Sequence, residues 1–386
     1  MRSRQPPAEL PPPSPDALAH SARLKTRIRS EIATAGGAIS FERYMDLALY
    51  APGLGYYSAG ARKFGAAGDF VTAPELSFLF GRCLGVQCAE LLRALDGGDI
   101  LELGAGSGAM AADLLAELEV RDTLPEHYWI LEVSAELRAR QRLTLAARAP
   151  KFFQRVQWLE HLPAAFSGVI LGNEVLDALP AIRFRRAAAG FEAYCVADQD
   201  GEFVWQLRPA SADLQHALAA LEADLPQPLA AGYSSETCLR LPALIASLAD
   251  ALTRGALLFT DYGYARAACY HPERHMGTLM CHYRQRAHDN PFLYPGLQDI
   301  TAHVDFTAVA QAGTDAGLTL AGFTTQAHFL LALGIAERAV DLNTARDVKL
   351  LTLPEEMGER FKAIGFVKGV DLALRGFGLR DLSYSL

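Results

Sequence analysis

The segment from residue 100 to residue 108 joins a short apolar run to three glycines at alternate positions. The run, Ile100-Leu101-Glu102-Leu103, is typical of a strand that is buried on both faces. Apolar residues between 110 and 118 then recur at helical spacing, which indicates an amphipathic helix. The glycines are Gly104, Gly106 and Gly108. Because glycine has no Cβ, this loop can adopt positive φ and let its backbone N–H groups approach a ligand closely.

A strand, a tight loop and a helix in this order form half of a doubly wound α/β unit. The glycine spacing alone is weak evidence for a ligand site, because the chain has 32 glycines among 386 residues and a structural turn is the alternative. The flanking strand and helix strengthen the interpretation. Together they predict an α/β fold with a nucleotide-like ligand at the loop.

Polar side chains also end three later apolar runs. Glu132 ends the first run, and Asn173 and Glu174 end the second. Open α/β sheets bind ligands beyond the carboxyl ends of their strands, so we expect these side chains to face the site. Asp261 ends the third run, where packing or capping is favoured over chemistry.

The chain is long enough for two domains, or for one domain with large insertions. A proline-rich tail is expected to be disordered and to precede a helical and loop region and a Rossmann-like sheet domain. Alternating runs predict an antiparallel insertion followed by helical segments, and residues 271–302, which show no clear period, predict a long functional loop. The expected ranges are 1–20 for the tail, 21–80 for the helical region, 81–386 for the sheet domain, and about 181–253 and 269–304 for the insertions.

Charge and cysteine usage exclude several classes of partner. With 44 acidic and 36 basic residues, the net charge of −8 argues against nucleic acid. No run reaches the roughly 18 apolar residues of a membrane helix, so no membrane insertion is expected. The six cysteines lack C-x-x-C spacing, which predicts reduced thiols, no disulfide and no metal. Together with the absence of an apolar signal segment, this predicts a cytoplasmic protein.

The glycine spacing bears on the choice of ligand. Dinucleotide enzymes carry G-x-G-x-x-G and place a pyrophosphate on the helix N-terminus, whereas this chain has G-x-G-x-G. A sulfonium cofactor has no phosphate and needs carboxylates for its hydroxyl and ammonium groups. Glu102 and Glu132 suit that ligand better, since one carboxylate can accept hydrogen bonds from both ribose hydroxyls.

Two further candidate positions have plain structural explanations. Thr72 and Glu75 have the spacing of a capping box before a long apolar helix face, so Asp69 and Thr72 either hold the ligand or only shape the loop and cap the helix. Trp158, next to Gln157, is either a core residue or a neighbour of the adenine ring.

Several ordered motifs together resemble one known family. The chain is similar to the S-adenosylmethionine-dependent methyltransferases that include MidA and the mitochondrial complex I assembly methyltransferase. The resemblance covers nearly everything beyond the proline-rich tail. The matching segments are Tyr50–Tyr57, Gly68–Glu75, Leu101–Gly108, Glu132–Ser134, Asn173–Pro180, Asp261–Gly263, Asp299–Phe306 and Met357–Phe361.

This resemblance implies a Rossmann-like, seven-strand class I methyltransferase sheet and S-adenosyl-L-methionine as the cofactor. For the mitochondrial relative it implies methylation of an arginine on a respiratory complex I subunit, so a protein substrate is expected here. The residues expected to hold the cofactor are Asp69, Thr72, Glu102, Gly104, Gly106, Gly108, Glu132, Gln157, Trp158 and Asn173.

Methyl transfer from a sulfonium is an in-line displacement, so the main task of the enzyme is alignment. Arginine has a pKa above about 12 and must lose a proton around the displacement. Carboxylates that grip the guanidinium can localise its charge on the other nitrogens. We expect Glu174 and Asp177 to do this, with Asp305 as a third member, although capping or support is the alternative for the pair. Because Glu174 and Asp177 are three residues apart, they would share one face if that segment is helical.

Two other functions stay open from the sequence. A nicotinamide-dependent oxidoreductase could use the same kind of sheet, but the glycine spacing disfavours it. A non-catalytic partner in complex assembly could retain the fold and the cofactor while the chemistry has lapsed. The methyl acceptor itself leaves no recognisable sequence pattern.

Overall fold

The computed structural model describes residues 10–58 and 72–386, which divide into two compact units. We call them the N-terminal unit and the sheet unit. Of the described residues, the N-terminal unit comprises 10–58, Ala178–Leu239 and Arg266–His303, and the sheet unit comprises 72–177, Arg240–Ala265 and Val304–Leu386. Most of both expected insertions therefore groups with the N-terminal region rather than with the sheet.

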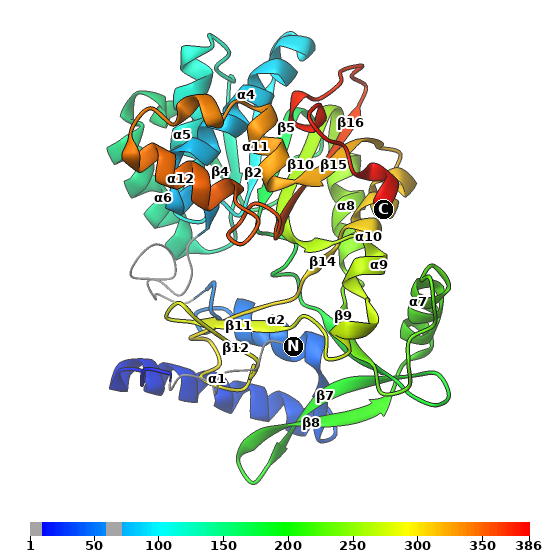
Figure 1. Cartoon of the computed structure of the whole chain (residues 1–386). Coiled ribbons are helices and arrows are strands. Elements are labelled where there is room, and N and C mark those ends of the chain that lie inside the picture. Colours follow the sequence, from blue (N-terminus) through cyan, green and yellow to red (C-terminus); the bar gives the residue numbers. More distant parts are fainter. Residues whose placement is uncertain (1–9, 59–71) are drawn as a thin grey trace. The chain divides into compact units, whose positions relative to one another are not determined.

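The sheet unit has the strand order β15-β16-β10-β5-β2-β3-β4, with the short β14 paired to β10 (Figure 1). Strands β4, β3, β2, β5 and β10 run parallel, and β16 is antiparallel to both β10 and β15. The strands are β2 (Asp99–Leu103), β3 (Tyr128–Leu131), β4 (Val156–Leu159), β5 (Phe166–Asn173), β10 (Leu252–Tyr264), β14 (Val304–Asp305), β15 (Thr319–Thr325) and β16 (Phe361–Lys368). The expected α/β class and its seven-strand path are confirmed.

The order of the parallel strands positions the site. From β2 the chain builds outward through β3 and β4, and then returns to the other side of β2 with β5 and β10. The direction of winding thus reverses between β2 and β5. Open α/β sheets bind ligands at such a reversal, beyond the carboxyl ends of the strands.

Helices of the sheet unit cover this sheet. Helix α4 packs against α5, α11 and α12, and α8 packs against α10 (Figure 1). The helices are α3 (Ala73–Leu76), α4 (Phe78–Leu95), α5 (Ala109–Val120), α6 (Ala135–Arg148), α8 (Leu241–Ala251), α10 (Phe306–Asp315), α11 (Gln326–Ala332) and α12 (Leu342–Thr352). Short 3-10 turns occur at Pro150–Arg155, Ala336–Arg338, Arg375–Phe377 and Ser383–Ser385.

Close approach of α4 and α5 explains two glycines inside a helix. A Cβ at Gly81 would lie 2.8 Å from Cβ of Asp113, and one at Gly85 would lie 2.7 Å from Cβ of Glu117.

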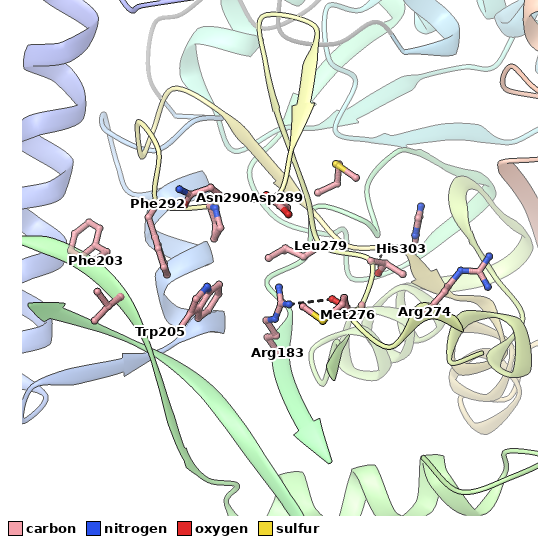
Figure 2. A pocket seen from close by; sticks show the side chains of 15 residues that line it. Arg183, Phe203, Trp205, Arg274, Met276, Leu279, Asp289, Asn290, Phe292 and His303 are labelled. Atoms are coloured by element: carbon pink, nitrogen blue, oxygen red, sulfur yellow. Dashed lines mark hydrogen bonds between the residues drawn. The ribbon is translucent and has the colours of Figure 1, made fainter. Parts of the chain in front are cut away.

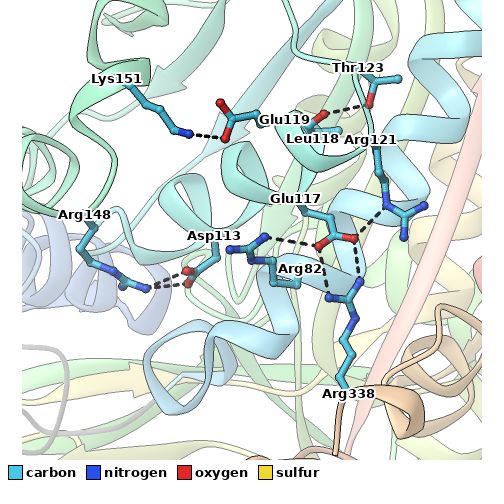
Figure 3. Close-up of polar contacts among 10 residues, drawn as sticks. All are labelled: Arg82, Asp113, Glu117, Leu118, Glu119, Arg121, Thr123, Arg148, Lys151 and Arg338. Atoms are coloured by element: carbon cyan, nitrogen blue, oxygen red, sulfur yellow. Dashed lines mark hydrogen bonds and ion pairs between the residues drawn. The ribbon is translucent and has the colours of Figure 1, made fainter. Parts of the chain in front are cut away.

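The Glu117 carboxylate is buried between these helices and pairs with the guanidinium groups of three arginines (Figure 3). These are Arg82 at 3.5 Å, Arg121 at 2.9 Å and Arg338 at 2.7 Å. Burial acts to raise the pKa of Glu117, but the hydrogen bonds and charges of Arg338 and Arg121 outweigh it and hold the pKa below the usual value.

The expected capping box at Thr72 and Glu75 is wrong. The Thr72 side chain makes no capping hydrogen bond to α3, and the Glu75 carboxylate instead accepts one from the Ser107 hydroxyl in the glycine loop. The expected continuous helix is also broken, because Ser77 is extended and its Oγ accepts a hydrogen bond from the backbone N of Leu79. Glu75 therefore contacts Ser107, which is distant in sequence, instead of taking part in a capping box with Thr72.

In the N-terminal unit, a five-stranded antiparallel sheet has the order β1-β7-β6-β9, with β8 beside β7, and a second sheet has the order β12-β11-β13. The strands are β1 (Ala38–Ser40), β6 (Ile182–Arg186), β7 (Phe191–Gln199), β8 (Glu202–Pro209), β9 (Ser234–Thr237), β11 (Met280–Tyr283), β12 (Arg286–His288) and β13 (Asp299–Thr301). The helices are α1 (Pro15–Thr34), α2 (Phe41–Tyr50), α7 (Ala212–Ala223) and α9 (Arg266–Cys269), with a 3-10 turn at Pro272–Arg274.

Two expectations for this unit need correction. Residues 15–20, assigned to the disordered tail, are helical, because the Ser14 side chain caps α1 at the backbone N of Ala17. The stretch expected to be one long loop between 271 and 302 contains β11, β12 and β13. The antiparallel β6, β7 and β8 agree with the sequence prediction.

Candidate functional site

The glycine loop connects β2 to α5 with three residues in the left-handed region. Gly104 has φ +60°, Gly106 has φ +53° and Gly108 has φ +86°. Side chains are disfavoured at such angles, so the spacing of the glycines follows from the backbone path. Gly108 also starts α5 without a capping side chain. The loop therefore presents bare backbone at the carboxyl end of β2.

Glu132, which follows β3, is buried and belongs to a hydrogen-bonded chain that reaches the glycine loop. Its Oε1 accepts from the backbone N of Ser134 at 2.9 Å, and its Oε2 accepts from Nε2 of Gln141 at 3.1 Å. The same Nε2 donates to the carbonyl of Gly106 at 3.1 Å. Nε1 of Trp158 donates to Oε1 of Gln141 at 2.8 Å. Three sequence candidates are thus linked through one glutamine.

Gln141 is the residue that sequence reasoning missed. Its signal was available, because Leu137, Gln141 and Leu145 lie four residues apart and form the buried stripe of the arginine-rich helix α6. A glutamine on such a stripe needs a buried hydrogen-bond partner. Trp158 is half-buried, and the guanidinium of Arg142 lies 4.3 Å above its ring, while Gln157 is exposed on β4.

Glu102 is fully buried inside β2, with 2% of its surface exposed. The hydroxyl of Tyr128 on β3 donates to Oε2 of Glu102 at 2.6 Å. Burial raises the pKa of Glu102 to about 7, the Tyr128 hydrogen bond opposes that rise, and the charge of Glu132 adds to it. The Glu102 carboxyl can therefore gain or lose its proton near neutral pH.

The carboxyl ends of β5 and β10 are joined by side-chain contacts. Oγ1 of Thr260 donates to Oδ1 of Asn173 at 2.7 Å, and Nδ2 of Asn173 donates to Oε1 of Glu174 at 3.2 Å. The backbone N of Glu174 donates to the carbonyl of Thr260 at 2.9 Å. Glu174 has φ +52°, a conformation that costs energy for a residue with a side chain and is found most often at functional sites.

Asp261 holds the turn that follows Glu174. Its Oδ2 accepts from the backbone N of Val175 at 3.1 Å, of Leu176 at 2.8 Å and of Asp177 at 3.3 Å. Asp261 is only 1% exposed, and burial raises its pKa well above the ordinary value, with added repulsion from Asp177 and Glu174. Asp261 therefore caps the backbone N–H groups of this turn, which is the structural role that the sequence favoured for it.

Residues 174–180 form a turn rather than a helix, so Glu174 and Asp177 do not share a helix face. The two carboxylates are still brought together at the end of β5, where both raise the pKa of Asp261. Asp305 caps α10, since its Oδ1 accepts from the backbone N of Thr307 and of Ala308. Asp69 lies outside the described residues, and Thr72 precedes α3.

The described part of the chain contains neither a metal-binding cluster nor a membrane-spanning helix. In residues 10–58 and 72–386, no group of histidine, cysteine, aspartate and glutamate has the arrangement needed to hold a metal ion. Over the same residues, no helix combines the length and apolarity required to cross a bilayer.

Comparison with known proteins identifies the family to which this chain belongs. Residues 83–324 match the family model described as "Putative S-adenosyl-L-methionine-dependent methyltransferase". The chain belongs to this family. A Burkholderia thailandensis protein of this kind, crystallised with S-adenosyl-homocysteine, is 47% identical, with a TM-score of 0.93 over 98% of this chain and 100% of that chain. A native crystal structure from the same organism is 45% identical, with a TM-score of 0.89 over the same shares of both chains.

Curated relatives extend the comparison. The protein arginine methyltransferase NDUFAF7 of Danio rerio is 30% identical over 88% of this chain and 86% of its own length. Its Drosophila melanogaster homologue is 28% identical over 95% of this chain and 90% of its own length. Both are named as mitochondrial proteins. The expectation of a cytoplasmic protein is thereby corrected, since reduced thiols and the lack of a signal segment do not distinguish these compartments.

This chain is therefore an S-adenosylmethionine-dependent methyltransferase, as the sequence predicted. The residues present fit this cofactor. The left-handed glycines leave the loop backbone uncovered, and the Glu132 carboxylate, whose two oxygens are held by Ser134 and Gln141, has oxygens that can each accept more than one hydrogen bond. The family assignment also removes the nicotinamide-dependent oxidoreductase from consideration.

Proposed function

We propose that this methyltransferase transfers the methyl group to an arginine guanidinium of a protein. The observation that carries the proposal is the pair of carboxylates, Glu174 and Asp177, on a turn anchored by Asp261 beyond the switch between β2 and β5. Relatives that cover most of the chain are named protein arginine methyltransferases, which supports it. The family resemblance suggests a subunit of respiratory complex I as the acceptor.

The cofactor would be held by the bare loop and the acids around it. The set consists of Asp69, Thr72, Glu102, Gly104, Gly106, Gly108, Glu132, Gln157, Trp158 and Asn173, to which the structure adds Gln141. Bound there, S-adenosylmethionine supplies an electrophilic methyl group on a sulfonium. Glu132 is the member with the firmest position, because both of its oxygens are fixed by hydrogen bonds.

Acceptor activation depends on the carboxylates. An arginine side chain is charged at every physiological pH, so a carboxylate must hold its guanidinium and draw the positive charge away from the reacting nitrogen. The Glu174 carboxylate is oriented for this by Nδ2 of Asn173. Asp305 would act only as a third member, because its Oδ1 caps α10.

The test uses the full-length enzyme with methyl-labelled cofactor and a lysate from cells that lack the gene. Mass spectrometry of the labelled protein is expected to place the methyl group on an arginine nitrogen. Glu174→Gln should lower labelling about a hundredfold or more, in the range typical for loss of one charged catalytic group, and leave the affinity for S-adenosyl-homocysteine within about twofold.

Glu355→Gln provides the matched control, because it makes the same chemical change at an exposed turn of the sheet unit. This variant should label as the wild type does. A methyl group on another atom, or full labelling by Glu174→Gln, would contradict the proposal.

A further inference from the structure

The N-terminal unit contains a pocket of about 660 Å³ that the cofactor chemistry does not use. Its walls come from β8, from residues 274–280 and from residues 289–292 (Figure 2). Sites for small ligands and side chains typically have volumes of a few hundred to about 1,000 Å³. The pocket is therefore large enough to enclose an aromatic group together with a neighbouring polar group.

One side of the pocket is an aromatic wall. Phe203 and Trp205 of β8 and Phe292 form it, with ring centroids 4.7 Å apart for Trp205 and Phe292 and 6.3 Å apart for Phe203 and Phe292. Phe41 of α2 packs against this wall, with its ring centroid 5.0 Å from that of Trp205. Rings packed in this way offer a rigid surface on which another ring can stack.

Arg183 of β6 brings a guanidinium to this wall (Figure 2). Its side chain is 12% exposed, and its guanidinium carbon lies 5.4 Å from the Trp205 ring and 5.2 Å from the Tyr194 ring. Within the described part of the chain it donates one hydrogen bond, to the carbonyl of Met276 at 3.1 Å. A guanidinium has several N–H donors in a planar fork, so donors remain for an acceptor in the pocket.

A buried carboxylate behind Arg183 fixes this position. Glu236 is fully buried and accepts from the backbone N of Thr278 at 2.7 Å. Its Oε1 lies 3.6 Å from NH1 of Arg183, which is an ion pair but too long for a hydrogen bond. A Cβ at Gly277 would lie 2.4 Å from Oε2 of Glu236, so glycine is needed for the 277–278 backbone to reach the carboxylate.

Burial of this pair is costly, because two charges are removed from water without a hydrogen bond between them. A pair with only a structural role would gain from closing to a bidentate contact. The open distance leaves the fork of Arg183 available to a third group with acceptor oxygens. Arg274 and His303 also line the pocket, and Asp289 is the acidic member of the lining set.

We propose that this pocket binds an aromatic side chain together with an adjacent carboxylate, presented by the protein acceptor of the methyltransferase. The ring would stack on Trp205 and Phe292, and the carboxylate would accept hydrogen bonds from Arg183. The proposal rests on the proposed function only in taking the acceptor to be a protein. A free aromatic acid shares the chemistry, and the experiment separates the two sources.

The test titrates the full chain, labelled with 5-fluorotryptophan, with small probes while ¹⁹F resonances are recorded. Trp129 and Trp158 lie in the sheet unit, so the resonance lost in Trp205→Phe reports on the pocket. The probes are N-acetyl-Phe-Glu-amide, its Phe-Gln and Ala-Glu counterparts, and 3-phenylpropionate. We expect N-acetyl-Phe-Glu-amide to move the Trp205 resonance and to bind about tenfold or more tightly than its Phe-Gln counterpart, the loss typical of a charge-assisted contact. It should also bind more tightly than the Ala-Glu counterpart, which lacks the ring, and than 3-phenylpropionate, which lacks the peptide groups.

Arg183→Lys keeps the charge beside Glu236 but loses the planar fork, and should remove the preference for Phe-Glu over Phe-Gln. Arg208→Lys on β8, outside the pocket lining, makes the same change and should retain that preference. No shift of Trp205, or equal binding of Phe-Glu and Phe-Gln by the wild type, would overturn the proposal. Equal binding of 3-phenylpropionate would overturn the assignment to a protein. None of these measurements requires methylation, so a failure here is separate from a failure of the proposed function.

Discussion

The buried carboxyl of Glu102 should make the stability of this protein fall as the pH rises. Its pKa is about 7 in the folded chain, against an ordinary value of 4.5. The folded state therefore holds the Glu102 proton when the unfolded chain has already lost it. Stability from this group is complete below pH 4.5, declines as the pH rises through the interval, and levels off above pH 7. At about 1.4 kcal/mol per pH unit, the decline is roughly 3 kcal/mol.

Glu102→Gln tests this magnitude. Glutamine has nearly the same shape and keeps an acceptor for the Tyr128 hydroxyl, but it does not titrate. Urea unfolding of the wild type and the variant at pH 5, 6, 7 and 8 should show that the variant lacks a pH-dependent decline of about 2.5 kcal/mol, the part of the total that falls within this range. The variant should therefore gain stability relative to the wild type between pH 5 and pH 8.

Tyr128→Phe provides a second check of the cause. The Tyr128 hydrogen bond lowers the pKa of folded Glu102, so its removal should extend the decline to higher pH, while the start of the decline near pH 4.5 stays where the unfolded chain sets it. Glu355→Gln, at an exposed position, should leave the pH profile unchanged. Parallel curves for the wild type and Glu102→Gln would refute the reasoning, because Glu102 would then ionise equally in the folded and unfolded states.

Three further outcomes are expected. Arg338→Ala should lower the free energy of unfolding by about 1–3 kcal/mol in urea titrations, because Glu117 stays buried and loses one of its cationic partners. Since Arg338 helps to lower the pKa of Glu117, this loss should be seen at pH values above the ordinary pKa of a glutamate and should shrink as the pH falls below it. Asp261→Ala should cost roughly 3–6 kcal/mol and speed hydrogen exchange at residues 175–177, whose N–H groups lose their acceptor, while Asp261→Asn should recover part of this. Gly106→Val should abolish calorimetric binding of S-adenosyl-homocysteine, since φ +53° suits glycine and the side chain fills ligand space.

The sheet and the glycine loop could be predicted because their signals are local. The buried strand β2, the glycines and the helix α5 follow one another in the sequence, and each pattern is long enough to show its period. The polar ends of β3 and β5 were likewise visible in order along the chain. The parallel fold then brings these ends to one edge of the sheet without any further information.

Other features depended on partners that are distant in sequence. Ser107 takes Glu75 away from its expected cap, and Asp261 holds a turn more than 80 residues earlier. The strands between 280 and 301 are only three or four residues long, too short to show an alternation. Pairing across the sheet, rather than local propensity, makes them strands.

The position of the proposed acceptor carboxylates, Glu174 and Asp177, also depends on residues that are distant in sequence. Glu174 keeps a left-handed backbone although it is not a glycine, and this conformation persists only where surrounding contacts determine it. Its backbone N is bound by the carbonyl of Thr260, and the next three backbone N–H groups are bound by Asp261, so β10 supplies all of these contacts. The register of β10 against β5 therefore sets where Glu174 and Asp177 lie. A Cβ at Gly172, the partner of Phe259 in that register, would lie 2.6 Å from the Phe259 ring, so this glycine protects the geometry of two acids that it does not touch.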